Sequence, residues 1–208
     1  MIELDSLHVG DLKIYRDTET FAYGTDSVLL AYFAGMKKAT SVCDLCSGSG
    51  IVPLLMSAES RACFTCVEID EKAAALCEKS VELNGLENRI KTICADVADV
   101  AKLLPYGKFD LVTANPPYIP SEVMQTLEPE LEHEPRIALT DEGDGLSFYR
   151  AIINLYKYAL TEDGVIVLEH GYDQYEKVRE IAEENGMSAE VILDYGKRQR
   201  GAVLKNVR

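Results

Sequence analysis

The chain has little positive charge and no long hydrophobic segment. Its 208 residues carry 21 Lys and Arg against 35 Asp and Glu, a formal charge of −14. Tight non-specific binding of nucleic acid needs basic side chains that neutralise phosphates, so this balance argues against it and leaves room only for a local basic patch. No apolar run approaches a membrane span, and the first residues lack the pattern of a signal peptide. We therefore expect a cytoplasmic protein without a membrane segment.

Cysteine is present, but its spacing does not require a metal. Cys43 and Cys46 form one C-x2-C pair and Cys63 and Cys66 another, at a separation that fits a zinc ribbon. Cys63 and Cys66 fall on one predicted strand, where alternation turns them to opposite faces and prevents a single tetrahedral site. We predict buried free thiols, no metal and, in a reducing cytosol, no disulfide.

Strand-like runs alternate with amphipathic helical segments from residue 41 onward. This pattern predicts an α/β fold with a doubly wound, mostly parallel seven-stranded sheet and an antiparallel end. Upstream, a hairpin around Gly10 precedes a helix that begins near Thr25 or Asp26. We expect a single domain over 1–208, with 1–40 as an N-terminal extension of the core 41–208. The expected strands are 42–45, 63–67, 90–95, 109–114, 165–168, 191–193 and 202–204, and the expected helices 50–60, 70–84, 149–160 and one that ends at Gly186, with a long loop over 119–145.

The segment Asn115-Pro116-Pro117-Tyr118 directly follows the apolar strand 109–114. It therefore lies at the carboxyl end of a strand, where open α/β sheets place their ligands. The prolines fix φ and remove two backbone donors. The Asn115 side-chain oxygen and the Pro116 carbonyl can then accept both hydrogens of one planar –NH2 group, and Tyr118 can stack on the group that carries it. A plain proline turn is the alternative, and the glycine loop upstream favours the functional interpretation.

That glycine loop, residues 44–50, follows the first strand of the main sheet and opens a helix. Gly48 and Gly50 allow a ligand to approach the backbone closely. NAD binding is the rival interpretation, but its fingerprint needs a third glycine where this chain has Pro53.

Carboxylates follow three successive strands around the loop. Asp44 ends the first strand and Glu68 the second, where a carboxylate suits the two hydroxyls of a ribose. Asp96 ends the third and can receive an adenine amino group. Each alone is more often a helix cap or a solvated charge, but together they indicate an adenosine cofactor.

With Asn-Pro-Pro-Tyr, these features resemble class I S-adenosylmethionine-dependent methyltransferases of the N-methylating branch, which have a Rossmann-like fold. The resemblance implies that S-adenosylmethionine is the cofactor, with Asp44 near its methionine part and Cys46 at the usual first glycine. No strong base is required, and neither His133 nor His170 sits in a recognisable catalytic pattern. The implied catalytic residues are Asn115, Pro116 and Tyr118, and the implied cofactor-binding residues are Thr25, Asp44, Cys46, Gly48, Gly50, Glu68, Asp96 and Asn115.

Two resemblances divide the chain. From residue 115 onward it is similar to the release-factor glutamine methyltransferases, or HemK family, through 115–120, 134–135, 138–139 and 144–150. That family methylates the glutamine amide in the Gly-Gly-Gln loop of peptide release factors. Residues 23–30 and 44–50 are instead similar to tRNA adenine-N6 methyltransferases, and we expect no counterpart in these 208 residues to the helical N-terminal domain typical of the glutamine enzymes.

Charge favours the protein acceptor. Eight carboxylates stand between residues 119 and 145 against Arg136 alone, and such a loop at the mouth of a site repels RNA. The partner is therefore expected to be a release factor before tRNA. A non-catalytic binding module is a third interpretation, against which the intact motif argues, and the sequence makes no prediction of the oligomeric state. The eight carboxylates are Glu122, Glu128, Glu130, Glu132, Glu134, Asp141, Glu142 and Asp144.

Overall fold

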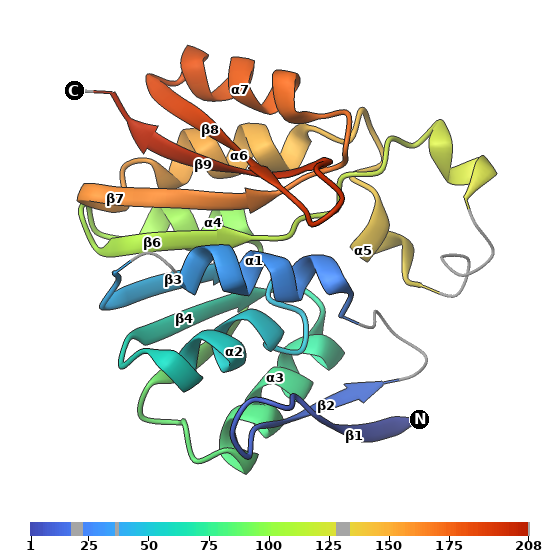
Figure 1. The fold of residues 1–208 in the computed structure, drawn as a ribbon, viewed down its shortest axis with the longest axis vertical. Helices are drawn as coiled ribbons and strands as arrows, with labels where there is room; N and C mark the ends of the chain where they lie inside the picture. The colour runs from blue at the N-terminus through green and yellow to red at the C-terminus, as the bar shows by residue number, and fades with distance from the viewer. Residues whose placement is uncertain (18–22, 36–37, 128–133, 208) are drawn as a thin grey trace.

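The computed structural model describes residues 1–17, 23–35, 38–127 and 134–207. Its main sheet has seven strands in the order β5-β4-β3-β6-β7-β9-β8 (Figure 1). β5 to β7 pair in parallel, whereas β9 is antiparallel to both of its neighbours. This confirms the predicted fold class, including the antiparallel end. The strands are β3 (Ser41–Leu45), β4 (Cys63–Glu68), β5 (Ile90–Cys94), β6 (Phe109–Ala114), β7 (Leu160–Glu169), β8 (Met187–Leu193) and β9 (Gln199–Asn206).

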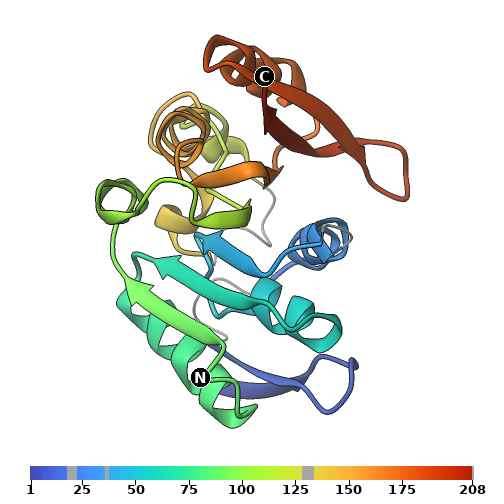
Figure 2. The same cartoon turned by 90° about the vertical axis from the view of Figure 1, so that its left-hand side faces the viewer.

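Helices cover both faces of the sheet (Figures 1 and 2). α1, α2 and α3 pack on one face and α4, α6 and α7 on the other, because successive strand side chains point to opposite faces. The sheet therefore has a hydrophobic core on each face: the first core, under α1, α2 and α3, and the second core, under α4, α6 and α7. Val42 of β3 belongs to the first core, for example, and its neighbour Cys43 to the second. Among the described residues no helix combines the length and hydrophobicity needed to cross a bilayer. The helices are α1 (Thr25–Gly35), α2 (Ile51–Glu59), α3 (Glu71–Leu83), α4 (Val97–Leu103), α5 (Arg136–Leu139), α6 (Ser147–Tyr156) and α7 (Tyr175–Glu184), with a 3₁₀ turn, η1 (Val123–Thr126).

The predicted N-terminal hairpin is confirmed as β1 (Ile2–Ser6) and β2 (Lys13–Asp17), an antiparallel pair separate from the main sheet. It docks on α3: the Lys13 N–H donates to Asn84 Oδ1 at 3.0 Å, and Asn84 Nδ2 donates to the Lys13 carbonyl at 2.7 Å. The side chain of Ile14 is fully buried against the first core. This docking brings the end of β2 to the carboxyl edge of the sheet.

Three local predictions were wrong. Helix α4 was not predicted, because seven residues are too short to show a clear period; it is fixed by packing, with the Tyr156 hydroxyl donating to the Val97 carbonyl at 2.8 Å. α6 ends at Tyr156 and not at Leu160, which instead begins β7 opposite Phe109. The expected loop 119–145 contains η1 and α5.

The cysteine prediction needs a correction as well. Cys43 and Cys66 are buried, but Cys63 and Cys94 are exposed, because strand ends lie beyond the cover of the helices. In the part of the chain that the structure describes, no three His, Cys, Asp or Glu side chains are arranged to hold a metal ion.

Candidate active site

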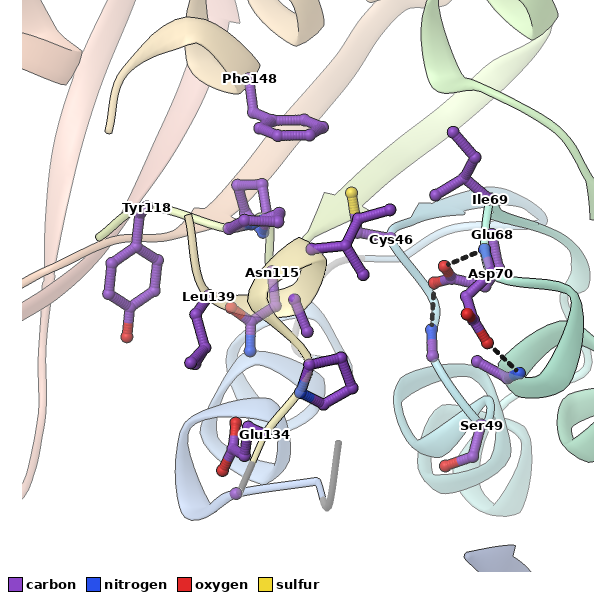
Figure 3. A pocket seen from close by; sticks show the side chains of 18 of the residues that line it. Cys46, Ser49, Glu68, Ile69, Asp70, Asn115, Tyr118, Glu134, Leu139 and Phe148 are labelled. Atoms are coloured by element: carbon purple, nitrogen blue, oxygen red, sulfur yellow. Dashed lines mark hydrogen bonds between the residues drawn. The ribbon is translucent and has the colours of Figure 1, made fainter. Parts of the chain in front are cut away.

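A cavity of about 330 Å³ opens at the carboxyl edge of the parallel strands, a size typical of small-ligand sites. The glycine loop and the end of β4 form one side, and the segment 115–118 after β6 forms the other. Figure 3 shows Glu68 and Asp70 on the first side and Asn115 and Tyr118 on the second, with Cys46 between them. The structure thus brings together the two motifs that the sequence predicted to share a site. A smaller cavity shares Cys46, Gly48, Ser49 and Asn115 with it and reaches Asp44.

Glu68 organises the glycine loop. Its carboxylate accepts from the Gly48 N–H at 2.8 Å and from the Asp70 N–H at 2.9 Å (Figure 3). A carboxylate carries about four lone-pair sites, so two bonds leave acceptor capacity for hydroxyl groups of a ligand. Ser47 connects the loop to β4, since its hydroxyl accepts from the Val67 N–H at 3.1 Å. Glu68 therefore lies where the sequence analysis placed it, with its orientation fixed by the backbone.

The two loop glycines have different surroundings. Both have left-handed φ, +55° at Gly48 and +88° at Gly50. A β-carbon at Gly48 would meet nothing within 4 Å, so this residue faces open space in the cavity. A β-carbon at Gly50 would stand 2.6 Å from the sulfur of Cys77, and Gly50 does not line the cavity. The predicted close approach of a ligand therefore has support at Gly48, whereas Gly50 allows α2 and α3 to pack together.

Cys46 occupies the position where the resembling family has a glycine, and its φ of 54° explains that preference. A side chain in the left-handed region costs roughly 1 to 2 kcal/mol. Cys46 lines both cavities and packs partly against the second core. The substitution of glycine by cysteine thus keeps the backbone conformation and places a sulfur in the cavity wall.

Asp44 is 2% exposed. Its Oδ1 accepts from the Thr113 hydroxyl at 2.6 Å, whereas Oδ2 has no hydrogen-bond partner among the described residues. Burial raises the pKa of Asp44 to about 7, against the lowering effect of its hydrogen bonds. A half-satisfied buried carboxylate at the end of β3 has one free oxygen for a donor of a ligand, which suits a positively charged group.

Two further predicted cofactor residues, Asp96 and Thr25, differ in their relation to the cavity. Asp96 lines the cavity and caps α4 by accepting from the Ala98 N–H at 2.7 Å. Thr25 is exposed at the start of α1, and it is its neighbours Gly24 and Asp26 that line the cavity. A role for Thr25 in cofactor binding stays a prediction.

At the elbow 115–118, all four residues line the cavity, and both prolines are buried. Asn115 Nδ2 donates to the Ser27 hydroxyl of α1 at 3.1 Å, which fixes the amide plane and leaves Oδ1 as an acceptor. Burial, reinforced by the charge of Glu169, raises the pKa of Tyr118, so its hydroxyl stays neutral.

Sequence reasoning missed the residues that hold this elbow in place. The buried Gln174 donates from Nε2 to the Tyr118 carbonyl at 2.9 Å and accepts at Oε1 from the Gly171 N–H at 3.0 Å. Gly145, with φ +75°, lies so close to the Tyr118 carbonyl that no β-carbon fits there. Nothing in the linear pattern singled out Gln174 or Ser27.

Glu169, the last residue of β7, was also missed and lines the same cavity. Here a signal existed, because a carboxylate at a strand end is the pattern that drew attention to Glu68 and Asp96.

The acidic loop is less repulsive than its composition suggests. Asp144 pairs with Arg150 and Glu142 with Arg136, while Asp141 accepts from the backbone of Gly143, Gly145 and Ser147. Of the loop carboxylates that the structure describes, Glu134 alone lines the cavity. The negative lining comes instead mainly from the strand ends and the N-terminal region. Glu128, Glu130, Glu132 and His133 lie outside the described residues.

Seven carboxylates and one arginine are among the lining residues of the main cavity. A site with this balance favours a cationic or neutral ligand over one with several phosphates. The carboxylates are Asp17, Asp26, Glu68, Asp70, Asp96, Glu134 and Glu169, and the arginine is Arg16.

Known proteins are similar to this chain in sequence. The release factor glutamine methyltransferase of Fusobacterium nucleatum subsp. nucleatum is 35% identical over 79% of this chain and 47% of its own length. The ribosomal protein uL3 glutamine methyltransferase of Francisella tularensis subsp. tularensis is 36% identical over 65% and 43%, respectively. The release factor glutamine methyltransferase of Agrobacterium fabrum is 30% identical over 93% and 68%. The chain thus spans a little under half the length of the first two relatives.

Solved structures show the same fold. The ribosomal protein L11 methylase of Lactobacillus delbrueckii subsp. bulgaricus superposes with a TM-score of 0.61 at 21% identity, over 92% of this chain and 84% of that one. The hMettl16 catalytic domain, solved in complex with the MAT2A 3'UTR hairpin 1, has a TM-score of 0.75 at 18% identity, over 96% and 76%. At these identities the likeness concerns the fold alone, and the fold serves proteins with different acceptors.

Residues 18–148, more than half of the chain, match the family described as "Methyltransferase small domain". That span contains both the glycine loop and the elbow, so the match covers both sides of the cavity. From this match and the relatives above, the chain belongs to the Methyltransferase small domain family.

Proposed function

We propose that this protein transfers a methyl group from S-adenosylmethionine to a planar nitrogen, the side-chain amide of a glutamine in a peptide release factor. The observation that carries the proposal is the shared cavity: the glycine loop with Glu68 lines one side of it, and the Asn115–Tyr118 elbow lines the other. A methyl donor and its acceptor must meet in line within one site, which this arrangement allows.

The residues of the first side fit the proposed cofactor. Gly48 faces open space, Glu68 has acceptor capacity for ribose hydroxyls, and the exposed apolar side chain of Ile69 lies beside them for a flat base. Asp44 presents an oxygen, Oδ2, that has no partner in the described part of the chain and is suited to an ammonium group. When bound, S-adenosylmethionine supplies a methyl group activated by a positive sulfonium, which the acidic lining would also attract.

The second side would orient the acceptor. Asn115 Oδ1, held in place through Ser27, and the Pro116 carbonyl would each accept one N–H of the acceptor group. An amide lone pair is delocalised into its carbonyl, so the nitrogen is a poor nucleophile. Two acceptors that stabilise the growing positive charge on nitrogen favour its rehybridisation and direct it at the methyl carbon. Tyr118 would stack on the plane of the amide.

Two findings support a protein acceptor. The cavity lining has one arginine among seven carboxylates, which disfavours a phosphate backbone at its mouth. The sequence relatives are named for release factors and a ribosomal protein, which also makes the cytoplasm the proposed compartment.

The likeness of residues 23–30 and 44–50 to tRNA adenine-N6 methyltransferases stays a prediction. We further propose that residues 1–40 extend one catalytic domain, since the end of β2 supplies Arg16 and Asp17 to the cavity.

Transfer of tritiated methyl from S-adenosylmethionine tests the acceptor. Purified release factor, ribosomal protein uL3 and bulk tRNA are offered in parallel, together with a release factor whose Gly-Gly-Gln glutamine is replaced by alanine. Label on release factor that disappears with the glutamine is the expected result. Label confined to tRNA would refute the protein acceptor while preserving methyl transfer, and absence of S-adenosylmethionine binding by calorimetry would refute both.

Asn115→Ala tests the elbow. The loss of one of two acceptors on the reacting nitrogen should lower kcat by about 100-fold or more, the range measured for single groups that stabilise developing charge. The Kd for S-adenosylmethionine should stay within about threefold, because Glu68 and Asp44 remain. Ser27→Ala, which frees the amide without removing it, should give a smaller loss of kcat. Normal turnover of Asn115→Ala would count decisively against the assignment.

A further inference from the structure

Glu169 is a buried carboxylate with little hydrogen bonding to the rest of the described chain. It is 3% exposed, and neither Oε1 nor Oε2 accepts a hydrogen bond of good geometry from the described residues. The Tyr118 hydroxyl lies near enough to lower the pKa of Glu169 by hydrogen bonding. Burying such a group with few partners is costly, because its polar oxygens lose the hydrogen bonds of water and its ionised form is disfavoured. It also lines the main cavity. Its burial and its place in the cavity lining together make Glu169 a candidate to contact a bound ligand.

The sheet places Glu169 beside the elbow. β6 and β7 are parallel neighbours, and the register pairs Ala114 with Leu168 at their carboxyl ends. Asn115, the first residue after β6, and Glu169, the last residue of β7, therefore stand side by side at the carboxyl edge, on strands roughly 4.8 Å apart. One segment holds the group proposed to orient the acceptor nitrogen, and the other presents a carboxylate to the same space.

Methylation of an amide nitrogen requires that a proton leaves. The nitrogen forms its bond to the methyl carbon while the carbon–sulfur bond breaks with its electron pair on sulfur. The nitrogen then has four bonds and a positive charge. It becomes neutral by losing a proton, and the electron pair of the broken N–H bond stays on nitrogen. The two carbonyl oxygens at Asn115 and Pro116 align the N–H groups but do not keep a proton near neutral pH. Loss of this proton needs no strong base, but a carboxylate beside the nitrogen can take it directly as the bond to the methyl carbon forms.

We propose that Glu169 is the catalytic residue that takes this proton. This inference rests on the proposed function. One carboxylate oxygen of Glu169 accepts the proton from the methylated nitrogen, becomes a carboxylic acid, and returns the proton to solvent after the product leaves.

The surroundings set the pH at which Glu169 acts. Burial raises the pKa of Glu169 to about 8, and the charge of Asp26 adds to this, against the lowering effects of Tyr118 and Arg200. A base is most effective when its pKa lies near the working pH. The ionisable groups around Glu169 are Asp26 of α1, Tyr118 of the elbow, Tyr149 of α6, the adjacent His170, and Arg200 of β9.

The test compares the pH dependence of kcat/KM for methyl transfer in Glu169→Gln, Glu169→Asp and wild type. Wild-type kcat/KM should rise about tenfold or more between pH 6 and 9. Glu169→Gln should fall by about 100-fold and lose that rise, whereas Glu169→Asp should keep part of both. Glu190→Gln, on the exposed face of β8, is the matched control and should behave as wild type. A Glu169→Gln enzyme with wild-type rate and pH profile would overturn the proposal.

A second measurement does not depend on turnover. Carbon-13 NMR of protein labelled at glutamate carboxyls should show one resonance that titrates well above the ordinary range of glutamate and vanishes in Glu169→Gln. A Glu169 resonance that titrates at the ordinary value would overturn the proposal, since the group would then be solvated and away from the acceptor. If wild type transfers methyl to no acceptor, the proposed function fails whatever this titration shows; if transfer persists without Glu169, only the present inference fails.

Discussion

The glycines at positions 48 and 50 have the same kind of backbone and opposite surroundings. Both need a left-handed φ, so both disfavour a side chain. Only Gly50 also lacks space, because Cys77 of α3 lies where its β-carbon would be. A loop glycine can thus serve the packing of the protein or its ligand, and the backbone angle alone does not tell which.

The pair Gly48→Ala and Gly50→Ala separates these roles. Gly50→Ala should lower the free energy of unfolding by about 2 to 4 kcal/mol, the sum of left-handed strain and a forced shift of Cys77. Gly48→Ala should cost about 1 to 2 kcal/mol but weaken S-adenosylmethionine binding by about tenfold or more, since its new methyl group enters the cavity. Urea unfolding and calorimetry measure the two effects. Equal losses of stability would contradict the packing role of Gly50.

At the scale of elements, the site depends on two neighbouring segments that hold each other. The elbow after β6 is stiff because of its prolines, but its position is set by the segment after β7. Gln174, just before α7, bridges the Tyr118 carbonyl and the Gly171 N–H, and Asp141 holds the turn that brings Gly145 against the elbow. The catalytic geometry is therefore decided by contacts between segments that are distant in sequence.

Gln174→Glu keeps the acceptor toward Gly171 and removes the donor toward Tyr118. We expect kcat/KM to fall by about 10- to 100-fold, because a small displacement of the elbow spoils the alignment of the acceptor nitrogen. The Kd for S-adenosylmethionine should change by less than about twofold, since the bond lies on the acceptor side. Equal losses in cofactor binding and turnover would instead indicate a general loss of structure.

At the scale of the whole molecule, two groups of carboxylates respond to pH in opposite directions. Burial raises the pKa of Asp44 to about 7 and that of Glu169 to about 8. Hydrogen bonds lower the pKa of several others, as at Asp110, where the Thr40 backbone N–H is the main donor, and at Asp144, where Arg150 lowers it to about 2. Raised groups stabilise the folded state below their unfolded pKa and lose that effect as pH rises through the folded value. Lowered groups lose their contribution as pH falls.

Stability should therefore be greatest near pH 4 to 5 and decline toward both sides. Each raised group adds a slope of up to about 1.4 kcal/mol per pH unit between its unfolded and folded pKa, from about 4 to 7 for Asp44 and from about 4.5 to 8 for Glu169, because the folded state holds the extra proton. Chemical unfolding at a series of pH values measures this curve, and Asp44→Asn or Glu169→Gln should flatten its alkaline limb. A wild-type protein that becomes more stable from pH 5 to 8 would contradict the burial of these two carboxylates.

The sequence predicted most of the fold because periodicity is a local property. The strands at 42–45, 63–67 and 109–114 and the helix after Asp70 appear where their apolar patterns placed them. The misses have tertiary causes: α4 is too short to show a period and depends on Tyr156, and residues 159–160 continue the apolar pattern of α6 but pair with β6.

The sequence by itself determined most of the order of strands and helices along the chain, apart from the short helices α4, η1 and α5. It also put the glycine loop, its carboxylates and the Asn-Pro-Pro-Tyr segment at strand ends, since each is a property of adjacent residues. Only the tertiary structure decided that Gly50 serves packing, that Gln174 and Ser27 fix the elbow, and that the buried carboxylate of Glu169 stands beside Asn115. The physical reason is that burial, register and close approach join residues far apart in the chain, and no local pattern records them.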